Sequence, residues 1–99
     1  MQALLPKISI ITVNFNQAEV TARLLDSLRL AAYPDLEIFV VDNASKEDAS
    51  WLKTDYPEII YISSDKNLGF AGGNNLAIHQ AKGAFVLLIN NDTEVPPGF

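Results

Sequence analysis

The stretch AFVLLINNDTEVPPGF, residues 84–99, decides how the chain is interpreted, because a run of apolar side chains leads directly into amides and a carboxylate. Residues 84–89 are all apolar, and Asn90, Asn91 and Asp92 follow them at once. A short continuous apolar run is typical of a strand that is covered on both faces, as in a parallel sheet. The segment therefore predicts a buried strand that carries polar groups at its carboxyl end.

Three further apolar runs precede this one along the chain. They are KISIITV at residues 7–13, LEIFVV at 36–41 and EIIYIS at 58–63, and none alternates cleanly between apolar and polar residues. Helix signals fall between the four runs, which predicts the order β-α-β-α-β-α-β. This alternation indicates the α/β class, with an open, mainly parallel sheet and helices on both faces.

The first two predicted helices begin at capping residues. Asn16 with Glu19 three residues later is a capping-box arrangement, and Ser45 with Asp48 repeats the pattern before a shorter helix. The third predicted helix covers residues 71–82 and ends at Gly83, whose place is typical of a C-terminal cap.

Polar side chains follow every predicted strand. Asn14, Asp42, Ser63 and Asp92 all lie at strand ends that a parallel sheet brings to one edge. Ligands of open α/β sheets bind at this edge. For Asp42 and Asp92, ordinary turn chemistry is an equally good explanation, since Asp is a common turn residue.

The segment NLGFAGGNN, residues 67–75, lies between the third strand and the third helix. Its glycines, Gly69, Gly72 and Gly73, allow a ligand to approach the backbone closely, and the helix start below them offers free N–H groups. Tight packing of the helix on the sheet is the alternative explanation. The glycine spacing matches neither a dinucleotide-binding fingerprint nor a P-loop.

Composition narrows the class of partner. The 99 residues suit one domain, 1–99, and the formal net charge of −5 without a basic run disfavours nucleic acid. A phosphorylated ligand would need backbone amides or a bound cation. The sequence has no cysteine, no apolar run of membrane-spanning length and no signal peptide, so a soluble, cytoplasmic protein is expected.

Three segments, in this order and spacing, resemble the amino-terminal half of a family 2 glycosyltransferase, an inverting enzyme with the GT-A fold. They are ISIITVNFN, EIFVVDNAS and NLGFAGGNN…AKGAFVLLINND, and the resemblance extends over residues 8–99. It implies a site for a nucleoside-diphosphate sugar, UDP- or dTDP-linked. By this resemblance Thr12, Val13 and Asn14 would line the base and ribose pocket, and Asp42 would hydrogen-bond the base or ribose.

The same resemblance assigns the remaining site residues. Asp92 matches the final Asp of the family's Asp-x-Asp element and would hold Mg²⁺ or Mn²⁺ against the diphosphate. Asn90 replaces the first Asp of that element and could hydrogen-bond the ribose. The glycine-rich segment would contribute Asn67, Gly69 and Asn75 to donor binding. The segment Gly73-Asn74-Asn75 stands where many members have Ala-Arg-Asn, so one cation near the donor is replaced.

In the family, the acceptor-binding half and the general base follow the Asp-x-Asp element. We therefore expect that this sequence is part of a longer enzyme and that it contains no catalytic base. We also expect that the 99-residue chain does not transfer sugar. Without later segments to cover them, Val86 and Leu88 are expected to face solvent and to favour a homo-oligomer. The alternatives are a nucleotidyltransferase-like enzyme and a non-catalytic α/β ligand-binding module.

Overall fold

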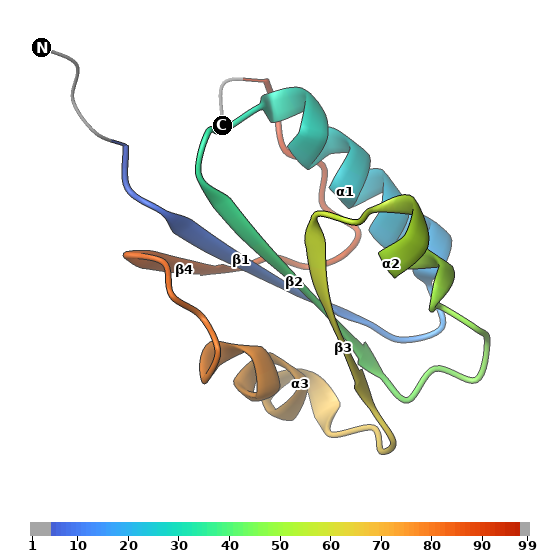
Figure 1. The fold of residues 1–99 in the computed structure, drawn as a ribbon. Helices are drawn as coiled ribbons and strands as arrows, with labels where there is room; N and C mark the ends of the chain where they lie inside the picture. The colour runs from blue at the N-terminus through green and yellow to red at the C-terminus, as the bar shows by residue number, and fades with distance from the viewer. Residues whose placement is uncertain (1–4, 98–99) are drawn as a thin grey trace, which may run out of the picture.

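The computed structural model describes residues 5–97 and contains one parallel four-stranded sheet in the order β3-β2-β1-β4 (Figure 1). Each strand pairs in parallel with its neighbours. The strands are β1 (Ile8–Asn14), β2 (Leu36–Asn43), β3 (Ile59–Ser64) and β4 (Phe85–Leu88). The predicted α/β class, the element order and the parallel sheet are confirmed.

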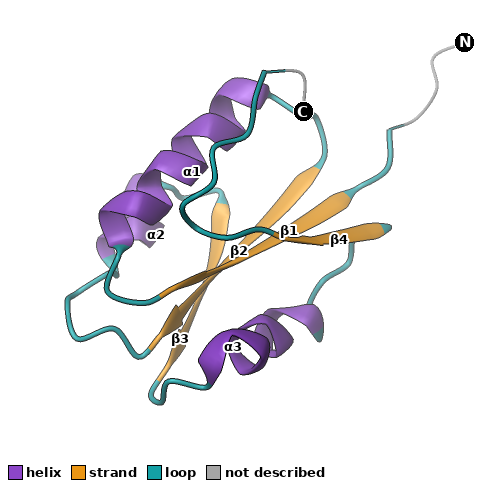
Figure 2. Ribbon diagram, turned by 180° about the vertical axis from the view of Figure 1, so that it is seen from behind, coloured by secondary structure: helices purple, strands orange, loops and turns teal. Residues whose placement is uncertain are grey.

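Helices cover both faces of the sheet. Helices α1 (Ala18–Ala31) and α2 (Trp51–Asp55) lie on one face, and α3 (Gly69–Ile78) lies on the other (Figure 2). No helix within residues 5–97 is long and apolar enough to cross a lipid bilayer.

Two apolar layers hold these elements together, because successive side chains of a strand point to opposite faces. Ile10 packs with residues of α1 and α2, whereas its neighbour Ile11 packs with Phe39 and with Ala77 of α3. Ile10 and Ile11 are both fully buried. The central strands β1 and β2 are therefore covered on both sides, as their continuous apolar sequence predicts.

The edge strand β4 differs from the expectation of a buried strand. All four of its residues are exposed, with Val86 at 42% and Leu88 at 48% of full exposure. Within residues 5–97, β4 pairs only with β1, on one side. The predicted exposure of Val86 and Leu88 is therefore confirmed, and the predicted burial of the strand is wrong for the described chain.

The predicted helix caps are also wrong. Helix α1 begins after Gln17, which makes no capping hydrogen bond through its side chain, and Asn16 adopts a left-handed conformation with φ 55°. The Asn16 side chain instead accepts a hydrogen bond from the Lys46 backbone N–H (2.7 Å). Ser45 lies well before α2, whose N-cap is Ser50. Asn16 and Ser45 serve contacts between segments, which a local capping pattern does not reveal.

Helix α3 starts and ends earlier than predicted, so Gly83 does not cap it. Its C-cap is His79, three residues before the predicted end at residue 82. Gly83 lies just before β4 against Ser9, where a Cβ atom would come within 2.6 Å of the Ser9 nitrogen. A close approach between backbone segments, and not helix capping, explains this glycine.

Candidate functional site

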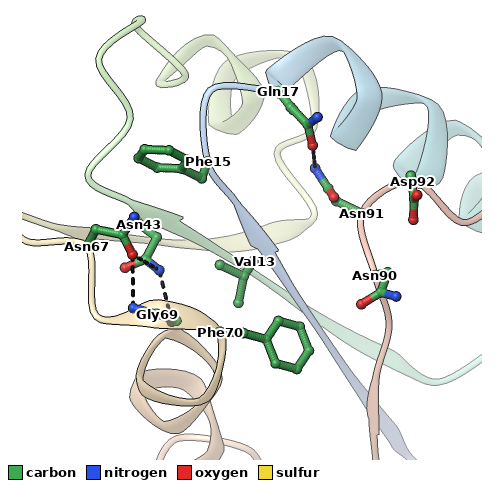
Figure 3. A pocket seen from close by; sticks show the side chains of 10 residues that line it. All are labelled: Val13, Phe15, Gln17, Asn43, Asn67, Gly69, Phe70, Asn90, Asn91 and Asp92. Carbon is green, nitrogen blue, oxygen red and sulfur yellow. Dashed lines mark hydrogen bonds between the residues drawn. The ribbon is translucent and has the colours of Figure 1, made fainter.

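A cleft of about 530 Å³ opens at the carboxyl edge of the sheet, between the start of α3 and the segment that follows β4 (Figure 3). It is lined by Val13, Phe15, Gln17, Asn43, Asn67, Gly69, Phe70, Asn90, Asn91 and Asp92. The cleft lies where open α/β sheets bind their ligands.

One wall of the cleft is the loop before α3, and Asn43 fastens it. The Asn43 amide nitrogen donates to the Asn67 side-chain oxygen and to the Gly69 carbonyl, both at 3.0 Å. The Asn43 oxygen accepts from the Leu68 N–H at 2.9 Å. Gly69 adopts φ +72°, a conformation that disfavours residues with a Cβ atom. The loop is thereby fixed with the amino-terminal end of α3 at the cleft, as Figure 3 shows.

The opposite wall is the segment Asn90–Asn91–Asp92. The Asn91 side-chain nitrogen donates to Thr21 Oγ1 at 3.1 Å and to Gln17 Oε1 at 3.4 Å. A turn bond from the Thr93 N–H to the Asn90 carbonyl follows (3.0 Å). Asp92 is exposed and lies in the cleft, so its carboxylate is accessible to a ligand.

Two exposed aromatic rings line the cleft around Val13. Phe15 follows β1, and Phe70 lies in the first turn of α3. Exposed aromatic faces in a polar cleft are suited to stacking against a planar base. The cleft thus combines apolar ring surfaces with amide groups and one carboxylate.

The Asp42 carboxylate lies apart from this cleft. Asp42 is only 6% exposed, and it accepts hydrogen bonds from the Asn14 side-chain nitrogen (2.9 Å) and from Ser45. It borders a second hollow of about 410 Å³ beside α2, which Tyr61 and Ser63 also line. Burial, then the nearby Asp42 and Asp48 carboxylates, raise the pKa of Tyr61 to about 12, so this hollow presents a neutral phenol at neutral pH.

The structure brings together five of the nine residues proposed from the sequence and separates the other four. Val13, Asn67, Gly69, Asn90 and Asp92 line the cleft. Thr12 and Asn14 are fully buried, because alternation along β1 points them away from the face of Val13. Asn75 is exposed on α3 but does not line the cleft, and Asp42 borders the other hollow.

Five lining residues were not predicted: Phe15, Gln17, Asn43, Phe70 and Asn91. Three of them, Phe15, Asn43 and Asn91, belong to the same strand-end positions that predicted the site. Phe70 lies inside the glycine-rich segment. If every residue at the strand ends and in the glycine-rich segment had been considered, these four residues would have been found. Nothing local in the sequence marks Gln17.

The residues of the cleft fit a divalent cation only in company with a ligand. Among the residues that the structure describes, Asp92 is the one carboxylate that lines it, beside the amide oxygens of Asn90 and Asn91. Within residues 5–97 there is no group of three or more His, Cys, Asp or Glu side chains that could hold a metal ion. Oxygen donors of this kind suit Mg²⁺ or Mn²⁺ that take further ligands from phosphate and water.

Comparison with known proteins defines the class to which this fold and cleft belong. The family model described as "Glycosyl transferase family 2" matches residues 9–99. The chain therefore belongs to glycosyl transferase family 2.

Curated relatives agree with this membership. The chain is 32% identical over 94 residues to the uncharacterized glycosyltransferase YwdF of Bacillus subtilis, covering 93% of this chain and 35% of that protein. It is 30% identical over 99 residues to a GalNAc(5)-diNAcBac-PP-undecaprenol beta-1,3-glucosyltransferase of Campylobacter jejuni, covering 95% and 32%. The chain spans about a third of the length of these relatives.

Solved structures show the same fold. S. aureus TarS 1–349 superposes with a TM-score of 0.84 at 26% identity, over 93% of this chain and 29% of that one. The mannosyltransferase PcManGT from Pyrobaculum calidifontis, in complex with GDP-Man and Mn²⁺, gives 0.83 at 26%, over 94% and 29%. TarS 1–349 in complex with UDP-GlcNAc gives 0.79 at 29% identity, over 87% and 26%. The fold is that of the GT-A glycosyltransferases.

Proposed function

We propose that this chain is the donor-binding region of a glycosyltransferase. It binds a nucleoside-diphosphate sugar in the cleft between the glycine-rich loop and Asp92, and the complete protein transfers the sugar to an acceptor hydroxyl with inversion. One observation carries this proposal: an exposed carboxylate at the end of β4 lies in the same cleft as the amino-terminal end of α3.

These two features suit a diphosphate held together with a cation. Backbone N–H groups at a helix start attract phosphate oxygens, and a carboxylate holds the hard cation that phosphates also ligate. A chain of net charge −5 needs such a cation to accept an anionic leaving group. When bound, the cation would neutralise charge on the departing diphosphate. The Mn²⁺ complex of PcManGT supports this assignment.

We further propose that the nucleobase stacks against the exposed rings of Phe15 or Phe70. The resemblance favours a pyrimidine, as UDP or dTDP, and the UDP-GlcNAc complex of TarS supports UDP. The GDP-Man complex of PcManGT makes GDP the competing nucleotide to test. Asp42 would act on the base or ribose from the neighbouring hollow.

The proposal is tested by calorimetry with UDP, dTDP and GDP, each with Mn²⁺ and with a chelator. We expect Asp92→Ala to weaken binding about 10-fold or more when Mn²⁺ is present. Asp42→Ala should weaken binding with and without metal. Asp65→Ala, at an exposed loop position outside the cleft, is the matched control and should bind as the parent chain does. Parental affinity in both Asp92→Ala and Asp42→Ala would refute the assignment.

We also propose that the 99-residue chain does not transfer sugar to an acceptor. The one carboxylate that residues 5–97 place in the cleft is assigned to the cation, and inversion needs a separate base. Slow hydrolysis of the donor is compatible with this proposal. Transfer by the purified chain at an ordinary enzymatic rate would overturn it.

The exposed edge strand supports a homo-oligomer. Within residues 5–97, Phe85–Leu88 form an apolar edge that pairs with β1 on one side only, and such edges recruit further chains. Light scattering at micromolar concentration should give at least twice the monomer mass. A monomer mass that is unchanged on tenfold concentration would contradict this proposal.

We propose the cytoplasm as the site of action, on the basis of the expected nucleotide-sugar donor and of a sequence without cysteine. Fractionation of cells that express the tagged chain tests this location. Recovery in a non-cytoplasmic fraction would contradict it.

A further inference from the structure

A chain of side-chain hydrogen bonds runs through the protein beneath the cleft, from the segment after β4 to the end of β2. The Asn91 side-chain nitrogen donates to Thr21 Oγ1 (3.1 Å), and the Thr21 hydroxyl donates to Asn14 Oδ1 (2.7 Å). The Asn14 side-chain nitrogen then donates to Asp42 Oδ1 (2.9 Å). These bonds join α1, β1 and β2 to the segment after β4. Two of the residues that form them, Thr21 and Asn14, are fully buried.

The direction of this chain is fixed by chemistry. A hydroxyl has one hydrogen, and that of Thr21 is given to Asn14, so Thr21 can only accept from Asn91. Asn14 gives its hydrogens to Asp42 and Ser45. Every bond therefore points toward the Asp42 carboxylate, and bonds aligned in this way strengthen one another in a buried setting.

At the start of this series of hydrogen bonds, the bonds to Thr21 and Gln17 fix the orientation of the Asn91 side chain. Its side-chain nitrogen donates to both Thr21 and Gln17, which leaves the amide oxygen as the group that remains for a ligand. Figure 3 shows the Asn91 nitrogen directed at Gln17, with Asp92 on the next position of the segment. Thr21 thus selects which atom of Asn91 is available beside the Asp92 carboxylate.

A second anchor holds the same segment further along α1. The Val95 N–H donates to Ser27 Oγ (3.0 Å), and Figures 1 and 2 both show the chain after β4 turning against this helix. Asp92 therefore lies between two points of attachment to α1, at Thr21 and at Ser27. Helix α1 is the support on which the exposed carboxylate is held.

We propose that Thr21 is a positioning residue for donor binding, which acts through Asn91 to hold the Asp92 carboxylate where a cation and a diphosphate meet. This inference rests on the proposed function. It assigns to a buried residue of α1, outside the cleft, a part in metal-dependent nucleotide binding. Asn14 is the buried partner that keeps the Thr21 hydroxyl in this orientation.

The test measures UDP affinity of the 99-residue chain with Mn²⁺ and with a chelator, and reports the ratio of the two. Thr21→Val keeps the shape of the side chain but removes the hydroxyl, and we expect it to lower the Mn²⁺-dependent affinity about 10-fold, the scale seen when supporting partners of metal ligands are lost. Metal-free affinity should change less than about twofold. Thr21→Ser should restore most of the ratio, and Thr54→Val, the same change at an exposed site on α2, should leave it unchanged.

The outcomes separate this inference from the proposed function. If the parent chain binds none of UDP, dTDP or GDP with Mn²⁺, the proposed function fails. If the parent chain binds and Thr21→Val keeps the parental ratio, the positioning role of Thr21 is refuted while the proposed function stands. Equal losses with and without metal indicate a merely structural role and overturn the inference as well.

A second variant covers the case in which Thr21→Val does not fold. Asn91→Ala removes the same bond from the half-buried end of the chain. Nuclear magnetic resonance relaxation of the Asp92 backbone amide should then show increased motion, together with a lowered Mn²⁺-dependent affinity. An unchanged Asp92 amide would contradict the inference.

Discussion

Asp42 and Asp92 are both aspartates at the carboxyl edge of one sheet, yet the structure gives them opposite surroundings. Asp42 is 6% exposed and accepts hydrogen bonds from Asn14 and Ser45, whereas Asp92 is exposed and lines the cleft. Asp42 lies within β2, between β1 and β3, and Asp92 lies beyond the end of the edge strand β4. Position in the sheet thus decides whether a strand-end carboxylate is buried and held by internal hydrogen bonds or is exposed in the cleft.

The largest expected effect is on the free energy of unfolding. Asp42→Ala leaves the buried Asn14 donor and the half-buried Ser45 donors without their acceptor and should cost about 2–3 kcal/mol. Asp92→Ala removes an exposed group and should change stability by less than about 0.5 kcal/mol. Urea unfolding of both variants at pH 7 measures the difference. Equal losses of stability would contradict the proposed difference between the two carboxylates.

The next largest effect is the loss of stability when a glycine is replaced by alanine. It contrasts the tightly packed, amino-terminal edge of the sheet with the open cleft. Gly83→Ala places a Cβ atom within 2.6 Å of the Ser9 backbone nitrogen. Such overpacking should cost about 2 kcal/mol, because the backbone of β1 must shift. At Gly69 in the cleft no atom lies within 4 Å of an added Cβ, so Gly69→Ala meets only the strain of φ +72°. That strain should cost about 1 kcal/mol.

Thermal unfolding of the two glycine variants, followed by circular dichroism, measures this order. A larger loss for Gly69→Ala than for Gly83→Ala would contradict the view that the two edges differ in packing.

A smaller effect concerns Glu37, which lies near the opposite end of β2 from Asp42. Burial acts to raise the pKa of Glu37, but hydrogen bonds from the Lys82 N–H (2.9 Å) and the Ser9 hydroxyl (2.8 Å) outweigh it and lower this pKa below its ordinary value. The ionised form therefore stabilises the fold at pH values above the pKa of the unfolded chain. This contribution is lost as the pH falls through the lowered pKa of the folded chain.

The measurement is the stability difference between the parent chain and Glu37→Gln. We expect the difference to be greatest near neutral pH and to shrink as the pH falls through the lowered pKa of Glu37 in the folded chain. A difference that grows as the solution becomes more acidic would show that Glu37 does not act through its charged form.

The smallest expected effect concerns two buried threonines. The Thr12 hydroxyl has no hydrogen-bond partner within residues 5–97, whereas that of Thr21 is shared between Asn14 and Asn91. Thr12→Val should therefore leave the free energy of unfolding within about 0.5 kcal/mol of the parent value or raise it, because no hydrogen bond is lost. Chemical denaturation checks this, with Thr21→Val as the destabilised reference. A loss at Thr12 as large as at Thr21 would contradict it.

The sequence predicts the sheet well because continuous apolar runs and strand-end polar residues are local patterns. The strand-end pattern and the glycine-rich segment also single out Val13, Asn67, Gly69, Asn90 and Asp92, which line one candidate cleft. Local patterns do not show which face of a strand meets the cleft, so Thr12 and Asn14 were assigned to the ligand although they are buried.

The wrong predictions of helix caps have a common physical cause. Asn16 and Ser45 resemble helix caps in sequence, but each bonds to a segment about thirty residues away. Thr21 reaches Asn91 across seventy residues. Hydrogen bonds between segments that only the fold brings together leave no periodic signal in the sequence.

The most direct test of the central claim is a map of where a nucleoside diphosphate and its cation bind. Amide spectra of the ¹⁵N-labelled chain are recorded with UDP and Mg²⁺, and then with Mn²⁺, whose paramagnetism broadens nearby signals. We predict shifted signals at Asn67–Gly69 and at Asn90–Asp92, and broadening by Mn²⁺ that is greatest around Asp92. Broadening centred on Asp42, Tyr61 and Ser63, with the signals of Asp92 unchanged, would contradict the account.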